Sequence, residues 1–350
     1  MGVQTGEKTY RLIRADGYAP HYYTDVGAPD EYPANQPRPR AGQHSTIVVY
    51  AEMVFDPPKI TGGLFNYGIY STYSINLSGC AFDSYNSSAG AYGGSNVSNK
   101  GSIAADTTLH DGIELSNATV KGTVLVSENG NPSTVIENVK STIIPPVTDP
   151  VTPPTGKLPT GWALGAPTPL SELASPPIEV NLSGITSSKT LAGNPDGKTP
   201  TYYHASQIDI SGNKGAIVTT GGPVLIYVDN GVSITGIGTT VPNNKPGNLQ
   251  IFVTGTASCK VQGNGSFFGG LYAPKSTVEF KASNSGKGGV WFGAVVAKTF
   301  STGGGGTPAF HFDLAMVTAA TKTPSTVPPR VGINTWQEIN TLAWDTGKTS

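Results

Sequence analysis

Six short segments repeat one pattern of apolar and polar positions along the chain. In each, two apolar residues flank a polar one, and a small polar residue and then Gly or Asn follow. Alternation with a period of two is typical of a short β-strand, and Gly or Asn allows the positive φ that a sharp corner requires. The pattern therefore predicts strands followed by corners at residues 75–79, 113–117, 180–184, 208–212, 232–236 and, more loosely, 259–263.

The spacing of apolar pairs in the C-terminal third indicates how these strands are arranged. Tyr227, Phe252, Tyr272 and Val296 each begin such a pair, at successive offsets of 25, 20 and 24 residues. This period is typical of one coil of a solenoid, in which stacked coils bury an apolar stripe that a single coil would expose. We therefore predict an all-β fold, a right-handed parallel β-helix. A compact β-sandwich is the alternative.

Prolines suggest how the chain is divided. Ten of them lie among the 33 residues from Pro145 to Pro177, which favours extended polyproline conformation and disfavours a helix or central strand. We predict a Pro-rich strap or linker at 143–179, between a first β-helix segment and a second one. The predicted organisation is a small N-terminal β cap with a Tyr- and Pro-rich loop at 1–60, β-helix segments at 61–142 and 180–318, and a C-terminal tail at 319–350.

Composition and charge narrow the classes of partner. The 350 residues include 45 Gly and 28 Pro, the poorest residues for a helix interior. The formal net charge of -1, without a long basic run, argues against a nucleic-acid partner. The sequence has no apolar stretch of about 20 residues. Because strand-like residues 9–13 follow the start abruptly, we expect an export segment or membrane helix upstream of Met1, and membrane contact only through that missing segment.

A search for catalytic and metal-binding motifs finds no complete set. The histidines have no partner at zinc-ligand spacing, and nucleophile and phosphate-loop motifs are absent. Asp209, Asp229 and Glu279 lie on neighbouring predicted strands, where they either line one outer face, as carboxylates of a polysaccharide-cleaving enzyme would, or are simply solvated. We expect solvated positions, and hence no enzyme, catalytic residue, metal or cofactor. The histidines are His21, His44, His110, His204 and His311.

Two groups of residues are candidates for structural or binding roles. His311 and Asp313 lie on the same side of one predicted strand, and we expect them to cap the end of the β-helix, where free backbone groups need partners. Tyrosine, with a large apolar ring and a polar tip, is favoured at interfaces. The first candidates for binding contacts are Tyr18, Tyr22, Tyr23 and Tyr32, for which ordinary loop packing is the alternative.

The two cysteines differ in their position relative to the repeated pattern. Cys80 follows a predicted corner, whereas Cys259 begins a predicted strand. A shared pattern position would favour pairing between stacked coils, and free cysteine is among the most buried residue types. We therefore predict two separate buried thiols rather than a disulfide.

Several segments together resemble a known family. The chain resembles the exported part of PilX-type, type IV pilus-assembly proteins over about residues 9 to 340. The resemblance implies an N-terminal hydrophobic pilin-like helix, missing here, a β-helical body and a non-catalytic surface or pilus-associated role; it transfers no catalytic residue. The matching segments are residues 9–13, 68–70, 75–79, 83–87, 222–228, 248–252, 269–274 and 310–313.

These observations lead to one functional expectation and its alternatives. We expect a non-catalytic extracellular or cell-surface protein, either a minor pilin-like pilus component or an adhesive one. Its expected partners are other pilus or cell-surface subunits and surface polysaccharide. The alternatives are a β-helical polysaccharide-active enzyme, a binder of an ordered surface such as ice, and a subunit that assembles end to end into filaments.

Overall fold

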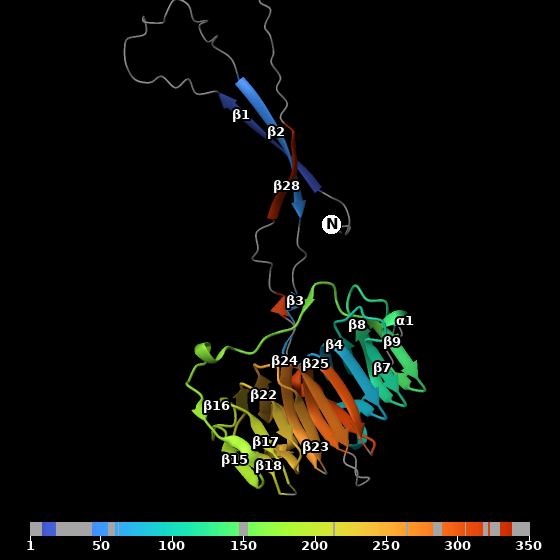
Figure 1. Cartoon of the computed structure of the whole chain (residues 1–350), viewed down its shortest axis with the longest axis vertical. Helices are drawn as coiled ribbons and strands as arrows, with labels where there is room; N and C mark the ends of the chain where they lie inside the picture. Colours follow the sequence, from blue (N-terminus) through green and yellow to red (C-terminus); the bar gives the residue numbers. More distant parts are fainter. Residues whose placement is uncertain are drawn as a thin grey trace, which may run out of the picture. The chain divides into compact units, whose positions relative to one another are not determined.

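The computed structural model of the chain describes residues 9–18, 44–54, 60–61, 63–146, 153–212, 214–263, 265–282, 289–304, 306–317, 321–322 and 330–337. Side chains are described only within residues 63 to 317 of these ranges. The structure is mostly β, with 8% helix. It comprises two compact units, residues 1–58 with 324–350 and residues 59–323 (Figure 1).

The first unit contains an antiparallel sheet of three strands. Their order is β1 (Thr9–Tyr18), β2 (His44–Val54) and β28 (Arg330–Gln337). β1 and β2 pair in register from Thr9 opposite Met53 to Tyr18 opposite His44. The segments predicted as a cap and as a tail thus share one sheet, because β28 comes from the C-terminal end of the chain.

The second unit consists mainly of parallel strands that pair in three ladders. In the first ladder, an apolar-polar-apolar alternation gives each strand a buried and an outward side. Its strands are, in order, β14 (Leu182–Ile185), β17 (Ile208–Ile210), β20 (Val232–Ile234), β23 (Cys259–Gly263), β24 (Ser266–Ala282), β25 (Val290–Gly304), β4 (Ile69–Ser78), β7 (Ile113–Ser116) and β9 (Ile136–Val139).

The second ladder shares the long strands β24, β25 and β4 with the first. Its strands are, in order, β13 (Ile178–Glu179), β16 (Thr201–Ala205), β19 (Val224–Val228), β22 (Leu249–Val253), β24, β25, β4, β6 (Gly101–Ala105), β8 (Thr119–Val126) and β11 (Thr155–Lys157). Within it, Tyr227, Phe252, Tyr272 and Val296 are direct partners, so the predicted offsets correspond to paired positions.

The third ladder has two parts. A separate sheet contains β15 (Ser188–Ala192), β18 (Ala216–Thr220) and β21 (Gly238–Thr240). The other part runs from the start of β25 through β26 (Ala309–Asp313), β5 (Ala81–Tyr85) and the start of β8 to β10 (Thr142–Ile144). The remaining elements are β3 (Ile60–Thr61), β12 (Trp162–Ala163), β27 (Thr321–Lys322), α1 (Pro132–Val135) and the 3-10 turns η1 (Gly94–Asn96), η2 (Leu170–Glu172), η3 (Pro242–Asn244), η4 (Pro246–Asn248) and η5 (Leu314–Met316).

The prediction of a right-handed parallel β-helix is wrong, because the strand pairings close on themselves. The parallel pairs β4–β6, β6–β8, β8–β5, β5–β26, β26–β25 and β25–β4 form a closed six-stranded barrel, with the other strands outside it. The physical reason is the length of three strands. β4, β8 and β25 continue past the corners expected between ladders, so each pairs with different neighbours along its length. β4 and β8 each join two ladders, and β25 joins all three.

The strands also do not stack in sequence order. β25, near the C-terminal end of this unit, pairs with β4, near its beginning, and β26 pairs with β5. Figure 1 shows this as an orange strand beside a blue one, with β9 and β15 towards opposite ends of the unit. The chain therefore enters the unit in the middle of the stack, builds one end, crosses to the other end and returns to the middle.

The core lies between the ladders and consists of apolar side chains in register. One row of the first ladder illustrates it, because eight of its nine residues are buried and only the last is half-buried. Burying such apolar surface stabilises the folded state by about 25 cal/mol for each Å² removed from water. The row is Leu182, Ile208, Val232, Cys259, Val278, Phe300, Ile75, Ile113 and Ile136.

Four of the six predicted corners have the positive φ that the Gly or Asn residues suggested. They are Gly79, Asn117, Gly184 and Gly212. Gly236 serves differently, since a Cβ atom there would overlap the carbonyl of Gly215. Here glycine permits close approach of two passes of the chain rather than an unusual dihedral angle.

Candidate functional site

The outward side of the first ladder presents one continuous row of polar side chains, which we call the outer row. Each member follows a residue of the core row by one position, so the alternation that turns one residue to the core turns the next one outward. All eight members are partly or fully exposed. They are, in strand order, Asp209, Ser233, Lys260, Glu279, Ser301, Asn76, Glu114 and Glu137.

Positions on either side of the outer row are polar as well. Lys281 lies two residues beyond Glu279 on the same strand, and its Nζ is 2.9 Å from Glu279 Oε2. Asn76 Nδ2 donates a hydrogen bond to Glu114 on the neighbouring strand. The flanking polar residues, also partly or fully exposed, are Gln262, Lys281, Ser78 and Ser116 on one side and Thr277, Thr299 and Ser74 on the other.

An open groove of about 570 Å³ lies at the β17–β20 end of this face. Its lining includes a carboxylate, two carboxamides and two hydroxyl groups, contributed by three successive passes of the chain. These groups supply both hydrogen-bond donors and acceptors. The polar residues of the lining are Gln207, Asp209, Asn230, Ser233 and Ser258.

The second ladder, by contrast, is covered by the Pro-rich segment between β11 and β13. The phenol of Tyr227 donates to the carbonyl of Thr168, 2.8 Å away, and Trp162 packs edge-to-face on Tyr67 with ring centroids 5.2 Å apart. Proline has no N–H to pair in a ladder, so this segment crosses the strands instead of joining them. As a result, the outward residues Tyr227, Phe252, Tyr272 and Tyr70 are buried.

A histidine joins three passes of the second ladder near its β13 end. His204 Nδ1 lies 2.8 Å from Glu179 Oε1, and His204 Nε2 lies 3.0 Å from Asp229 Oδ1. Carboxylates only accept hydrogen bonds, so both contacts are satisfied together when both ring nitrogens carry protons. The hydrogen bond to Asp229, with that to Glu179, raises the pKa of His204, and partial burial opposes the rise. The cluster was not predicted, although both acids lie 25 residues from His204, one coil spacing away.

Residues 178–318 match the model of a domain of unknown function, DUF7305. The matched region begins at β13 and extends just beyond β26, which is less than half of the chain. It includes the groove, the His204 cluster and the first five members of the outer row. No match is found among curated proteins or among solved structures.

The predicted cap residues His311 and Asp313 lie in β26, which has a parallel neighbour on each side rather than a free edge. His311 Nδ1 donates to Asp83 Oδ1 on β5, 2.6 Å away, and the Tyr92 phenol donates to Asp83 Oδ2 at 2.8 Å. Burial, with the adjacent Asp83, raises the pKa of Tyr92. The cluster ties β26 to β5 and to the following loop.

Asp313 completes this connection on the next outward position of β26. It is fully buried and accepts hydrogen bonds from the Ser87 backbone N–H at 2.9 Å and the Ser87 hydroxyl at 2.6 Å. The backbone N–H of Ala315 donates to the same carboxylate at 3.0 Å, which caps η5. All observed contacts of Asp313 are thus structural ones.

The remaining predicted residues are dispersed. Tyr18 is the last residue of β1, where only the backbone is described, and Tyr22, Tyr23 and Tyr32 lie outside the described residues. Asp229 contacts His204 and is not part of the outer row. Asp209 and Glu279 share the outer row but are three strand spacings apart, roughly 14 Å.

The prediction for the cysteines is confirmed. Cys80 and Cys259 are both buried and unpaired with each other. Burial raises the pKa of the Cys80 thiol to about 12 and that of Cys259 to about 11. Both thiols therefore stay protonated at neutral pH.

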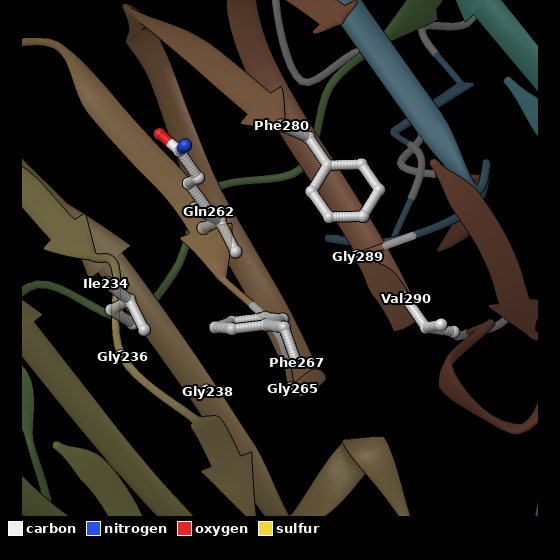
Figure 2. Close-up of a pocket in the computed structure, with 10 residues that line it drawn as sticks. Ile234, Gly236, Gly238, Gln262, Gly265, Phe267, Phe280, Gly289 and Val290 are labelled. Atoms are coloured by element: carbon white, nitrogen blue, oxygen red, sulfur yellow. The ribbon is translucent and has the colours of Figure 1, made fainter. Parts of the chain in front are cut away.

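A small cavity lies between β20, β23, β24 and the start of β25. Figure 2 shows Phe267 and Phe280 among its lining residues. Its volume of about 10 Å³ admits no more than about one water molecule. It is a packing gap next to glycines and not a ligand site.

Among the residues that the structure describes, no group of three or more His, Cys, Asp and Glu side chains is arranged to hold a metal ion. No helix in those residues has the length and apolar character needed to span a membrane.

Proposed function

We propose that this chain is a non-catalytic binding and structural module of the cell surface, and that the outer row of the first ladder is its binding face. The observation that carries the proposal is the in-register series of eight partly or fully exposed polar side chains, one per strand. Parallel strands place such groups about 4.8 Å apart. A regular row of hydrogen-bond donors and acceptors fits a partner whose own polar groups repeat at regular intervals.

The partner that fits this chemistry is a hydroxyl-rich polysaccharide. Sugar hydroxyls both donate and accept hydrogen bonds, and the outer row contains carboxylates, hydroxyls, an amide and an ammonium group. Four carboxylates against one ammonium make the row acidic. We therefore favour a neutral or amino-sugar polymer over an acidic one.

A non-catalytic role is supported by the spacing of the acidic residues in the half of the outer row that lies nearer the groove. Glycoside hydrolysis uses two carboxyl groups about 5 to 9.5 Å apart, which is less than the separation of roughly 14 Å between Asp209 and Glu279. Glu114 and Glu137 are direct partners on adjacent strands, and this pair favours a polysaccharide hydrolase as the second candidate function. Glu137, however, is exposed and would be hydrated.

The connectivity of the chain supports a role in which the second unit is presented to a binding partner. β3 and β27 pair with Thr61 opposite Thr321, so the chain enters and leaves this unit at neighbouring strands. The unit is thus an insertion between β2 and β28, which pair in another sheet. Together with the resemblance to PilX-type proteins, this arrangement supports a pilus-associated or adhesive role outside the cell.

Binding of the full chain to insoluble polysaccharides tests the proposal. We expect the wild type to co-sediment with at least one of chitin, cellulose and xylan. Replacing Asp209, Lys260 and Glu279 by Ala together is expected to weaken binding by about tenfold or more, the equivalent of about 1.4 kcal/mol. A matched control replaces the exposed Asp106, Lys121 and Glu172 by Ala and should bind like the wild type.

The outcomes separate the candidates. Equal binding by the outer-row variant and the wild type, or no binding by the wild type to any of these polymers, would reject the binding face. Release of reducing sugar by the wild type but not by Glu114→Gln would instead establish the hydrolase. The cell-surface role fails if deletion of the gene leaves piliation, surface attachment and matrix assembly unchanged.

A further inference from the structure

Each of the three ladders has an end strand at both ends of the stack, and each end strand has a neighbour on one side only. At one end, β9, β11 and β10 terminate the first, second and third ladders, and at the other end β14, β13 and β15 do so. Within the described residues, each of these six strands pairs with a single neighbour. No described segment pairs with the outer backbone N–H and C=O groups of these strands, and such groups can pair with another strand.

In each of the first two ladders, one row of paired residues runs from one end of the stack to the other. In the second ladder one row runs without a shift from Glu179 to Gly156, and in the first ladder the core row runs from Leu182 to Ile136. A further copy placed along the stack would continue both rows with the same alternation, because all the pairs are parallel. The second-ladder row is Glu179, His204, Tyr227, Phe252, Tyr272, Val296, Tyr70, Ala104, Leu125 and Gly156.

Both ends of the stack expose apolar side chains. Ile178 is 51% exposed in β13, and Val139 and Ile144 are 43% and 41% exposed in β9 and β10. Such exposed apolar residues on edge strands favour pairing with another chain. In the continued register, Glu179 of one copy falls beside Gly156 of the next.

We propose that a second copy of this chain docks head to tail, with β13 and β14 of one copy extending the ladders that end in β11 and β9 of the other. The two contacting surfaces are different, so a dimer still has one free end of each kind. Further copies can add at these ends, which gives a linear oligomer. The contact lies on the first and second ladders, in which one row stays in register from one end of the stack to the other. The inference does not depend on whether the outer row binds polysaccharide.

Sedimentation velocity of the full chain over a wide concentration range tests this contact. We expect a series of linear oligomers that lengthens with protein concentration. Ile178→Lys blocks one end and Val139→Lys the other, so each variant alone should be monomeric. An equimolar mixture of the two should form dimers and nothing larger, because each variant retains the end that the other has lost.

The matched control is Ile237→Lys, since Ile237 is 46% exposed but lies just before β21, away from both ends. It should oligomerise like the wild type. Ile144→Lys is a second variant of the β9 end, and melting curves show whether each variant is folded. A monomeric wild type at all concentrations, a mixture that stays monomeric, or loss of oligomers in Ile237→Lys would each overturn the proposal.

Discussion

The phenol of Tyr272 donates a hydrogen bond to the carbonyl oxygen of Gly165, 2.7 Å away, and this bond ties the Pro-rich segment to β24. Tyr272 is 7% exposed, and burial raises its pKa to about 12. Tyr227 makes the equivalent bond to Thr168 from β19. The crossing segment is therefore held at two strands of the second ladder, β19 and β24, by tyrosines that point outward from it.

Tyr272→Phe should loosen this segment without unfolding the unit. Loss of one buried hydrogen bond is expected to reduce the free energy of unfolding by about 1 kcal/mol. Limited proteolysis should then cleave within residues 158–177 faster than in the wild type. The control is Tyr73→Phe, because Tyr73 is 51% exposed. Unchanged cleavage rates in Tyr272→Phe would contradict this function of the bond.

The His204 cluster predicts a pH-dependent contribution to stability. The folded-state pKa of His204 is raised above its unfolded value by Asp229 and Glu179. Its stabilising contribution is therefore complete below the unfolded pKa, about 6.5, and is lost as the pH rises through the folded pKa. Because the cluster is partly exposed, its size should be at most about 1 kcal/mol.

Denaturant unfolding of His204→Gln measures this effect. The variant should be destabilised more at about pH 5.5 than at about pH 8.5, relative to the wild type. His110→Gln is the control, because the His110 side chain is 79% exposed beside Asp111 and its ion pair is screened by solvent. An equal loss for His204→Gln at the two pH values, or a larger one at the higher pH, would refute the assignment.

The buried thiols should be unreactive in the folded protein. Cys80 and Cys259 have raised pKa values, and thiolate is the reactive form. A thiol reagent such as an aromatic disulfide should label neither cysteine under native conditions and both after unfolding in denaturant. Fast native labelling of either residue, located by mass spectrometry, would show that its surroundings are open.

Asp313 should be one of the most sensitive polar positions. Asp313→Ala removes the acceptor for two backbone N–H groups and the Ser87 hydroxyl, so we expect a loss of at least about 2 kcal/mol in the free energy of unfolding. Asp209→Ala, at a partly exposed position of the outer row, should change the free energy of unfolding by less than about 0.5 kcal/mol. Equal effects of the two substitutions would contradict the structural role of Asp313.

Much of the local structure follows from the sequence alone. The alternation of apolar and polar residues correctly indicates strands such as β17 and β20, because one residue of each pair must be buried. The offsets between Tyr227, Phe252, Tyr272 and Val296 correctly indicate which positions are partners. The same alternation also determines that Asp209 and Glu279 point outward.

Other features depend on contacts that no local pattern encodes. The pairing of β25 with β4, and the closed barrel that results, depends on strands that continue past expected corners and on a chain that crosses the whole stack. Asp83 and His311 are 228 residues apart, and only this arrangement brings them together. Local side-chain chemistry specifies where a strand forms and which side it buries, whereas the choice of neighbour depends on the packing energy summed over distant segments.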